Sequence, residues 1–362
     1  MIALPLALAL GLAAGPSVLV DVLARDAPRS AVVSGPGRTL SLAARGDEIL
    51  VDGRPAEPVE LPPGRWRIEV AGPVHGVRGR VYAAALAVRA REGVLRFRAT
   101  MALEDYVAAV VASEALPGTP AAALEALAIV VRSYALASRD RHPGGALCDL
   151  AHCQLLRGHG ATRRHAAASG AAARATRGEV LRMPSGEIAA ATFHAACGGH
   201  TADPAEAFGS GASGARAVAD PGCHPRAWRA VLPADALPRA IRAALERSGD
   251  PGPAGLAGAE RAPVPRVLHG RGGWSVQVAD AVGRWRLSGD ALARALDASV
   301  GRGVVRSSRF TLSATGGRIV VRGSGHGHGV GLCQEGAARH AAAGEDRLGI
   351  LSRYFSARVA AL

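Results

Sequence analysis

The chain has 362 residues, of which 49% are apolar and 4% aromatic, and its formal net charge is +13. This apolar content supports one large or two ordinary domains and excludes a mainly disordered chain. Every basic residue is an arginine, and the arginines are scattered, without zinc-finger spacing or a basic stripe interleaved with aromatic residues. We therefore expect attraction to an acidic cell wall or membrane surface, and no nucleic-acid partner.

Residues 1–15 are almost continuously apolar and are followed by Pro16. This is the length of a signal-peptide core and is short for a membrane-spanning helix, although no basic residue precedes it. We interpret residues 1–24 as a signal-like segment or, if residues 17–23 extend the apolar run, as a membrane anchor. Either interpretation predicts an extracytoplasmic protein, in the periplasm or cell envelope.

Residues 25–100 consist of short alternating segments separated by Gly, Pro and Asp, a pattern typical of strands joined by tight turns. We predict a β-rich N-terminal subdomain with a packing role. Its strands are expected at residues 39–43, 48–51, 66–70, 85–88 and 94–97.

The pattern changes at residue 101, where apolar side chains recur with the spacing of a helix up to residue 115. Pro117 and Gly118 interrupt this helix. Thr119 followed by Pro120 predicts the N-cap and first turn of a second helix that ends near Ser138.

The remainder of the chain mixes strand and helix patterns without a regular strand–helix repeat, which predicts an α+β fold. In this fold a helical core carries the candidate catalytic Glu, between the β-rich N-terminal part and later mixed strands. We treat residues 101–362 as one catalytic region. Strands are expected at 179–183, 188–193, 274–278, 310–313 and 318–321. Loops are expected at 209–222, 249–265 and 323–331, and helices at 233–247 and after residue 331.

Glu114 lies eleven residues after Leu103, almost three helical turns, so it falls on the same inward-facing stripe as Leu103 and Val110. A carboxyl group that loses solvation there has a raised pKa and can hold a proton near neutral pH. Glycosidic cleavage requires such a general acid. The alternative is that the helix ends earlier and Glu114 turns into solvent.

Glycine occupies alternate positions from Gly325 to Gly331, around His326 and His328. Without side chains there, backbone amides can approach a ligand closely, and in an extended segment the two histidines point the same way. The run suits a sugar-binding loop, a metal site that uses the His-x-His pair, or a flexible linker. The apolar residues and the helix pattern that follow argue against the linker.

Four metal-type side chains, His142, Cys148, His152 and Cys153, lie within twelve residues. Two thiolates and two imidazoles suit a closed tetrahedral zinc site. A Cys148–Cys153 disulfide and ordinary buried cysteines beside surface histidines are the alternatives. The chain has five cysteines, so at least one is free, a metal ligand or paired with another molecule.

A further group, His194, Cys197 and His200, follows the strand expected at 188–193 and includes a Gly-Gly turn. These side chains could be metal ligands, a thiol nucleophile with its base, or parts of the turn. Nothing in the sequence selects among these interpretations.

Three blocks, at residues 103–136, 193–202 and 325–337, together resemble the SpoIID/LytB family of cell-wall proteins, as does the tail at 351–355. The second block reads FHAACGGHTA and the third GHGHGVGLCQEGA. The blocks occur in the family's order. The third departs from many members in having Leu332 and Cys333 where those have Met and Ser.

The resemblance implies a lytic transglycosylase that acts on peptidoglycan glycan strands. In such enzymes one glutamate protonates the glycosidic oxygen that leaves muramic acid, then accepts the proton of the C6 hydroxyl, and a 1,6-anhydro sugar forms without water. Glu114 matches the catalytic position. Some members hold zinc, and His142, Cys148, His152 and Cys153 look like the matching cluster, which would be structural and not needed for the chemistry. Side chains that we place around the cleft are Arg132, Tyr134, His326, His328 and Gln334.

Two other functions compete with glycan cleavage. Some LytB-type members are described as enhancers of a separate cell-wall amidase, so a non-catalytic glycan-binding enhancer is the main alternative. A zinc hydrolase that uses His326 and His328 is the third. Glu114, Arg132 and the glycine–histidine run favour catalysis, and the lack of an obvious second carboxylate favours a transglycosylase over a hydrolase.

Overall fold

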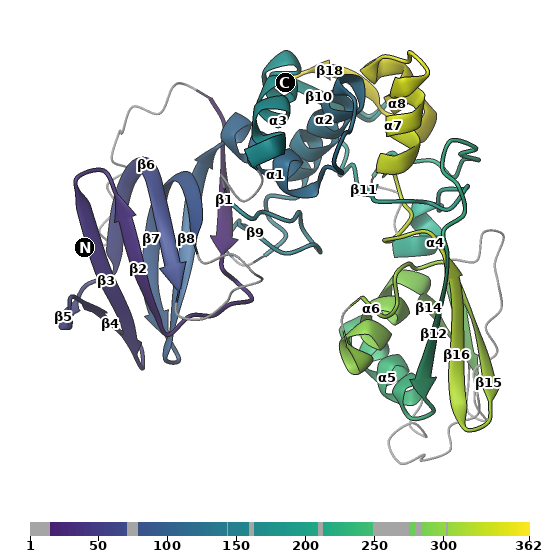
Figure 1. The fold of residues 1–362 in the computed structure, drawn as a ribbon, viewed down its shortest axis with the longest axis horizontal. Coiled ribbons are helices and arrows are strands. Elements are labelled where there is room, and N and C mark those ends of the chain that lie inside the picture. Colours follow the sequence, from purple (N-terminus) through teal and green to yellow (C-terminus); the bar gives the residue numbers. More distant parts are fainter. Residues whose placement is uncertain are drawn as a thin grey trace. The chain divides into compact units, whose positions relative to one another are not determined.

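A computed structural model describes residues 15–70, 79–142, 144–158, 163–208, 213–248, 275–279, 284–301 and 303–362 (Figure 1). The chain divides into two compact units, residues 1–179 with Leu362, and residues 180–361. Each unit combines helices with β-sheet, and the first begins with a long series of strands. The α+β class with a β-rich N-terminal part is therefore confirmed.

The first unit is built on a nine-stranded sheet with the strand order β5-β4-β3-β2-β6-β7-β8-β1-β9. Strands β2 to β8 run antiparallel to their neighbours, and along β7 and β8 buried side chains alternate with ones that are mostly half-buried. This alternation has the period of two that the sequence displays. The strands are β1 (Ser17–Val22), β2 (Ser30–Gly35), β3 (Arg38–Arg45), β4 (Glu48–Val51), β5 (Arg54–Ala56), β6 (Val59–Val70), β7 (Arg80–Arg91), β8 (Val94–Ala102) and β9 (Leu147–Cys148).

Strand β1 corrects the interpretation of residues 17–23 as part of a membrane anchor. It pairs antiparallel with β8 and parallel with β9. Its side chains Val18, Val20 and Val22 are buried in the core. The apolar residues alternate because they face a sheet interior, not a bilayer. The signal-like residues 1–14 lie outside the described part of the chain, in which no helix is both long and apolar enough to cross a membrane.

Three helices complete the first unit: α1 (Leu103–Glu114), α2 (Ala121–Ala137) and α3 (Arg163–Ala175). Strand β8 ends at Ala102 and α1 begins at the next residue, so no linker separates the sheet from the helices as a boundary at residue 100 would imply. Thr119 is not the N-cap of α2, because Pro120 occupies that position and the Thr119 hydroxyl donates to the carbonyl of Leu116 at 2.7 Å.

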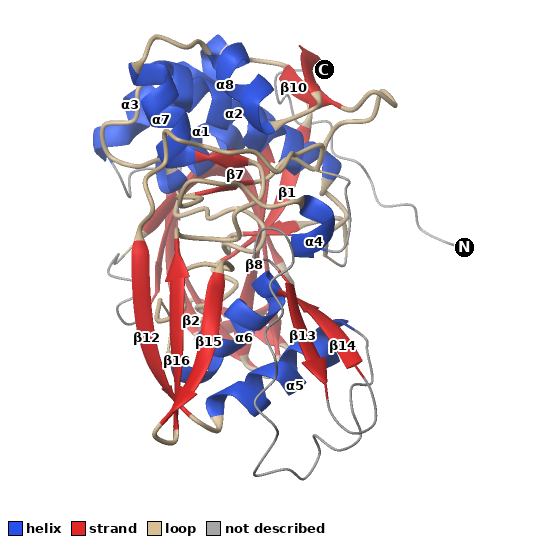
Figure 2. Ribbon diagram, turned by 90° about the vertical axis from the view of Figure 1, so that its right-hand side faces the viewer, coloured by secondary structure: helices blue, strands red, loops and turns tan. Residues whose placement is uncertain are grey.

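The second unit contains a three-stranded antiparallel sheet with the order β12-β16-β15, in which the strands lie side by side (Figure 2). Helices α5 and α6 pack on this sheet around a core that includes Leu232, Ile241, Leu296 and Val321. The strands are β12 (Ala227–Pro233), β15 (Phe310–Thr315) and β16 (Arg318–Ser324). The helices are α5 (Ala236–Ser248) and α6 (Gly289–Val300). Strands β13 (Ser275–Ala279) and β14 (Arg284–Ser288) form a separate antiparallel pair.

The rest of the second unit consists of short elements that bring distant sequence blocks together. Of the strand expected at 188–193, only Phe193 lies in a strand, β11 (Phe193–His194), which pairs in parallel with β17 (Leu332–Cys333). Residues 209–212 of one expected loop, the whole connection at 249–265, and Trp274 lie outside the described residues. The remaining elements are α4 (Pro204–Phe208), α7 (Gln334–Ala342), α8 (Arg347–Tyr354), and β10 (Glu179–Arg182), which pairs with β18 (Arg358–Ala361).

Candidate functional site

Glu114 is the last residue of α1, at the end of the helix face that buries Leu103 and Val110. Its carboxylate is half-buried, and Oε1 accepts a hydrogen bond from the backbone amide of Leu155 at 2.8 Å. Loss of solvation raises the pKa of Glu114 to about 7, although the Leu155 bond and the positive charge of Arg157 act in the opposite direction. Glu114 therefore does not turn fully into solvent, and its pKa shifts in the expected direction.

The segment at residues 154–157, which supplies the Leu155 amide, forms three hydrogen bonds with α1. The Tyr106 hydroxyl donates to Gln154 Oε1 at 2.9 Å, and the amide of Arg157 donates to Ser113 Oγ at 3.1 Å, on either side of the Leu155–Glu114 bond. Tyr106 is fully buried. Sequence reasoning missed this arrangement because the group that contacts Glu114 is a backbone amide, which carries no side-chain signal.

Immediately before this segment, the side chains of His142, Cys148, His152 and Cys153 converge, with their ligand atoms all within 4.8 Å of one another. Cys148 Sγ lies 3.2 Å from His152 Nε2, and Cys153 Sγ lies 3.2 Å from His142 Nε2. The two Nε2 atoms are 3.2 Å apart and the two sulfurs 3.5 Å apart. Four ligands at zinc-bond lengths span tetrahedron edges of about 3.3–3.8 Å.

The donor set therefore fits a four-coordinate zinc ion, and both cysteines are free thiols, not a disulfide. With four protein ligands the site would have no open coordination position, which is the arrangement of a structural zinc. Asp149, the residue after Cys148 and strand β9, is hydrogen-bonded to the large sheet and its connections. Its carboxylate accepts the amide of Leu23 at 2.8 Å and Arg80 Nη1 at 3.0 Å. The cluster thus connects the sheet to the segment that contacts Glu114.

Arg132 does not have the exposed position that a substrate contact requires. Its side chain is fully buried and pairs with both carboxylate oxygens of Glu104, at 2.6 and 2.9 Å. It also donates to the carbonyls of Ala173 and Glu179. These bonds tie α2 to α1 and to the end of α3, so Arg132 holds the helices together. The contact to substrate that we expected does not fit this burial.

Tyr134 is also buried, and burial raises the pKa of its phenol to about 12. Its hydroxyl donates to the carbonyl of His152 at 3.4 Å. Tyr134 therefore lies against the metal-ligand cluster and supports it from α2.

The glycine–histidine run lies in the second unit and packs against the block at residues 192–198. The His326 amide donates to the Ala196 carbonyl at 2.7 Å, and the Leu332 amide to the Thr192 carbonyl at 3.0 Å. A Cβ atom on Gly325 would collide with the Ala196 carbonyl oxygen, and one on Gly331 with that of Thr192. The glycines therefore permit close packing of two chain segments, and these two amides serve that packing instead of the ligand approach that we expected.

His326 and His328 do not point the same way. Each glycine of the run has a positive φ, so the segment is not an extended strand and the expected alternation is lost. The side chain of His326 is exposed. That of His328 is half-buried, with its ring 5.7 Å from that of His194, and its Nδ1 accepts the amide of Val330 at 3.1 Å. In the described residues the two histidines do not share a metal-type group.

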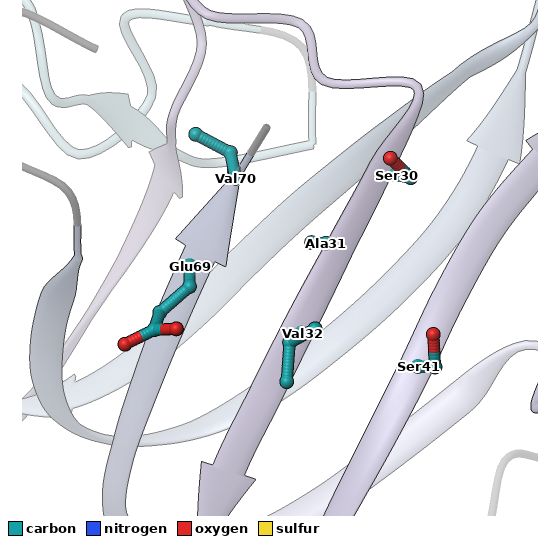
Figure 3. A pocket seen from close by; sticks show the side chains of 6 residues that line it. All are labelled: Ser30, Ala31, Val32, Ser41, Glu69 and Val70. Carbon is teal, nitrogen blue, oxygen red and sulfur yellow. The ribbon is translucent and has the colours of Figure 1, made fainter. Parts of the chain in front are cut away.

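Gln334 is buried at the first turn of α7. Like His326 and His328, it belongs to the second unit, whereas Glu114 and the four metal-type ligands belong to the first. A shallow hollow of about 300 Å³ on the large sheet, lined by side chains of β2, β3 and β6, contains none of the predicted site residues (Figure 3). Its lining is Ser30, Ala31, Val32, Ser41, Glu69 and Val70.

Part of the first unit is similar to a known protein family. Residues 91–183 match the family model of SpoIID, described as stage II sporulation protein. These residues are therefore similar to a SpoIID domain. The matched residues contain Glu114, Arg132, Tyr134 and all four side chains of the metal-type cluster, and they exclude the glycine–histidine run.

An uncharacterized protein of Brachyspira hyodysenteriae is 25% identical over 256 residues, which cover 70% of this chain. The matched region spans 65% of that relative's length, so just under two thirds of it is represented. Its description states no activity.

Proposed function

We propose that this protein is a peptidoglycan lytic transglycosylase in which Glu114 is both the acid and the base. The observation that carries the proposal is the half-buried Glu114 carboxyl, with a pKa of about 7 and one fixed bond to the Leu155 amide. A group with that pKa is present in both protonation states at neutral pH, as a residue that first donates and then accepts a proton must be.

In the proposed reaction, the Glu114 carboxylic acid protonates the oxygen that links C1 of N-acetylmuramic acid to the next sugar. The C1–O bond breaks, and its electron pair goes to the leaving hydroxyl. The Glu114 carboxylate then accepts the proton of the C6 hydroxyl as that oxygen bonds to C1. The product is a 1,6-anhydro sugar, and the carboxylic acid is restored without consumption of water.

The surroundings of Glu114 favour this route over hydrolysis. Glycosidases that use water need a second carboxylate about 5–9.5 Å from the first. Among the described residues, no carboxylate contributes to the pKa of Glu114, whose shift is explained by desolvation, the Leu155 amide and Arg157. The sequence also offers no obvious second carboxylate, which is consistent with a reaction in which the substrate's own hydroxyl is the nucleophile.

The remaining site residues have different proposed roles. The metal-type cluster would hold zinc as a brace for the segment that contacts Glu114, with no part in the chemistry. Arg132 and Tyr134 would position helices and the cluster. Of the predicted glycan contacts, His326 has an exposed side chain and is the one that we propose binds the substrate directly. We also propose an extracytoplasmic location, where the net charge of +13 favours an acidic cell wall.

The decisive experiment is mass spectrometry of products from purified glycan strands, with and without stem peptides. Wild type should release 1,6-anhydro-muramyl products, and Glu114→Gln should release none. Asp105→Asn is the matched control, because it removes an exposed carboxylate from the same helix and should leave the products unchanged. Products with reducing ends would replace the proposal with hydrolysis. Glycan binding without cleavage by folded wild type would favour an enhancer of a cell-wall amidase.

A further inference from the structure

The second unit contains a cluster of sulfur and nitrogen atoms outside the SpoIID match. Strands β11 and β17 pair so that His194 is opposite Cys333, and Cys197 follows three residues after His194. One ligand atom each from His194, Cys197 and Cys333 lies within 4.8 Å of the others, and all three side chains are buried. Cys223 is not one of this set of three, but it is buried as well, and its sulfur accepts the amide of Gly198, the residue after Cys197.

His194 presents one unused nitrogen in this cluster. Its Nδ1 lies 3.2 Å from the Val330 carbonyl, which can only accept, so Nδ1 carries the proton. In the neutral ring, a proton on Nδ1 leaves Nε2 as a bare lone pair. Nε2 is buried without a hydrogen-bond partner among the described residues. A neutral histidine anchored through one nitrogen to a carbonyl is the usual form of a metal ligand.

The contrast with His328 shows that this free nitrogen is specific. His328 lies beside His194, but its Nδ1 accepts the Val330 amide at 3.1 Å, and it also hydrogen-bonds to the backbone of Phe193. Both nitrogens of His328 are therefore engaged by the protein.

Two of the three sulfurs accept backbone amides, whereas the Cys197 thiol donates to Asp220 Oδ2 at 3.4 Å. Cys333 Sγ accepts the amides of Cys197 at 3.3 Å and Gly336 at 3.4 Å, the latter as the N-cap of α7. Cys223 Sγ accepts the amide of Gly198 at 3.3 Å. Three thiolates at such close range would repel one another, so all three ionise only when a cation balances them.

We propose that His194, Cys197, Cys223 and Cys333 bind a second zinc ion, in a closed Cys₃His site. Three thiolates and one imidazole are a ligand set that favours zinc and leaves no open position for catalysis. The ion would join segments that are 136 residues apart, since Cys197 and Cys333 are separated by that distance in the chain. It would thereby fix both ends of the glycine–histidine run. Nothing in this proposal depends on the reaction at Glu114.

The test is zinc stoichiometry of the full chain, purified without oxygen and with a reductant that does not chelate metals. Wild type should contain two zinc ions per chain, one for each ligand group. The Cys197→Ser/Cys333→Ser variant and the Cys148→Ser/Cys153→Ser variant should each retain one. In cobalt-loaded protein, the variant that keeps the three-cysteine site should show the stronger thiolate-to-cobalt absorption. His326→Gln, in the same run but with an exposed side chain, should keep both ions.

Two controls keep the result interpretable if a cysteine variant folds poorly. His194→Gln leaves all thiols in place and should weaken retention of one zinc against a competing chelator, while the other ion is unaffected. Hydrogen exchange of the α5–α6 core reports whether the second unit is folded. One zinc per wild-type chain with Cys197, Cys223 and Cys333 reduced would overturn the proposal. A disulfide among these three cysteines in the same preparation, detected by intact mass, would overturn it too.

Discussion

The Glu114 carboxylate accepts a hydrogen bond from the amide of Leu155, two residues after Cys153 of the metal-type cluster. The proposed acid–base and the proposed zinc ligands are therefore joined by a very short stretch of chain. A displacement of the cluster would therefore move the amide that holds the Glu114 carboxyl group, while the metal need not touch the substrate.

The pH dependence of cleavage follows from the raised pKa of Glu114. The first step needs the protonated acid, so kcat/KM should decline above about pH 7, by about tenfold for each further pH unit. A pH–rate profile on purified glycan strands measures this limb. A rate that stays constant well above pH 7 would exclude Glu114 as the group that protonates the leaving oxygen.

The same pKa predicts a gain of stability when the charge is removed. Because the pKa of Glu114 is raised from 4.5 to about 7, the folded state binds the proton more tightly than the unfolded state. The stability that this group contributes is complete below pH 4.5 and is lost as pH rises through about 7. Glu114→Gln should therefore melt at a higher temperature than wild type at about pH 8, and the difference should shrink at about pH 4.

Asp105→Asn provides the comparison for that experiment, since it neutralises an exposed residue of α1. Its melting temperature should follow wild type at both pH values. Equal shifts in the two variants would mean that helix charge, and not burial of Glu114, determines the effect.

Loss of the first metal-type cluster should reduce catalysis by displacing Leu155. In Cys148→Ser/Cys153→Ser, we expect a fall in cleavage rate on the order of 100-fold, because a catalytic group moved by about 1 Å loses that much. Hydrogen exchange should show a less protected Leu155 amide. Ser113→Ala removes the acceptor of the Arg157 amide and a bond to the Ala109 carbonyl within α1, but leaves the cluster intact, and it should have a smaller effect. Full activity in the metal-free double variant would refute the bracing role.

Arg132 should affect stability and not substrate affinity. Arg132→Met leaves the Glu104 carboxylate without its partner and should cost about 3–5 kcal/mol of unfolding free energy. Adding Glu104→Gln should recover part of that loss, because the uncompensated charge is removed. Urea unfolding of the single and double variants measures both terms. A folded Arg132 variant with weakened glycan binding and unchanged stability would restore the substrate contact inferred from the family.

Alanine substitutions at Gly331 and Gly316 separate the cost of a steric clash from the cost of backbone strain. Both have a positive φ, but a Cβ at Gly316 would meet open space, whereas one at Gly331 would collide with the Thr192 carbonyl. Gly316→Ala should cost about 1 kcal/mol from backbone strain alone. Gly331→Ala should cost clearly more, measured by denaturant unfolding. Equal costs would show that the run does not need close contact with residue 192.

Much of the first unit could be predicted from sequence because its signals are local. The alternation along β7 and β8, and the stripe that ends at Glu114, are periodic over a few residues and survive folding unchanged. The four ligands of the first cluster lie within twelve residues, so a single loop can bring them together. The raised pKa of Glu114 followed from its place on that stripe.

Only the tertiary structure decided which distant groups meet. The family resemblance predicts that Arg132 lies at the cleft. In the structure it lies in the helix interface, where it binds Glu104 and two backbone carbonyls. Cys333 joins His194 through the pairing of β11 with β17, and no periodicity in either segment encodes that partner. Periodic patterns report which face of a segment avoids water. Which residues pack against that face depends on contacts between segments far apart in the chain, and only the folded structure establishes these contacts.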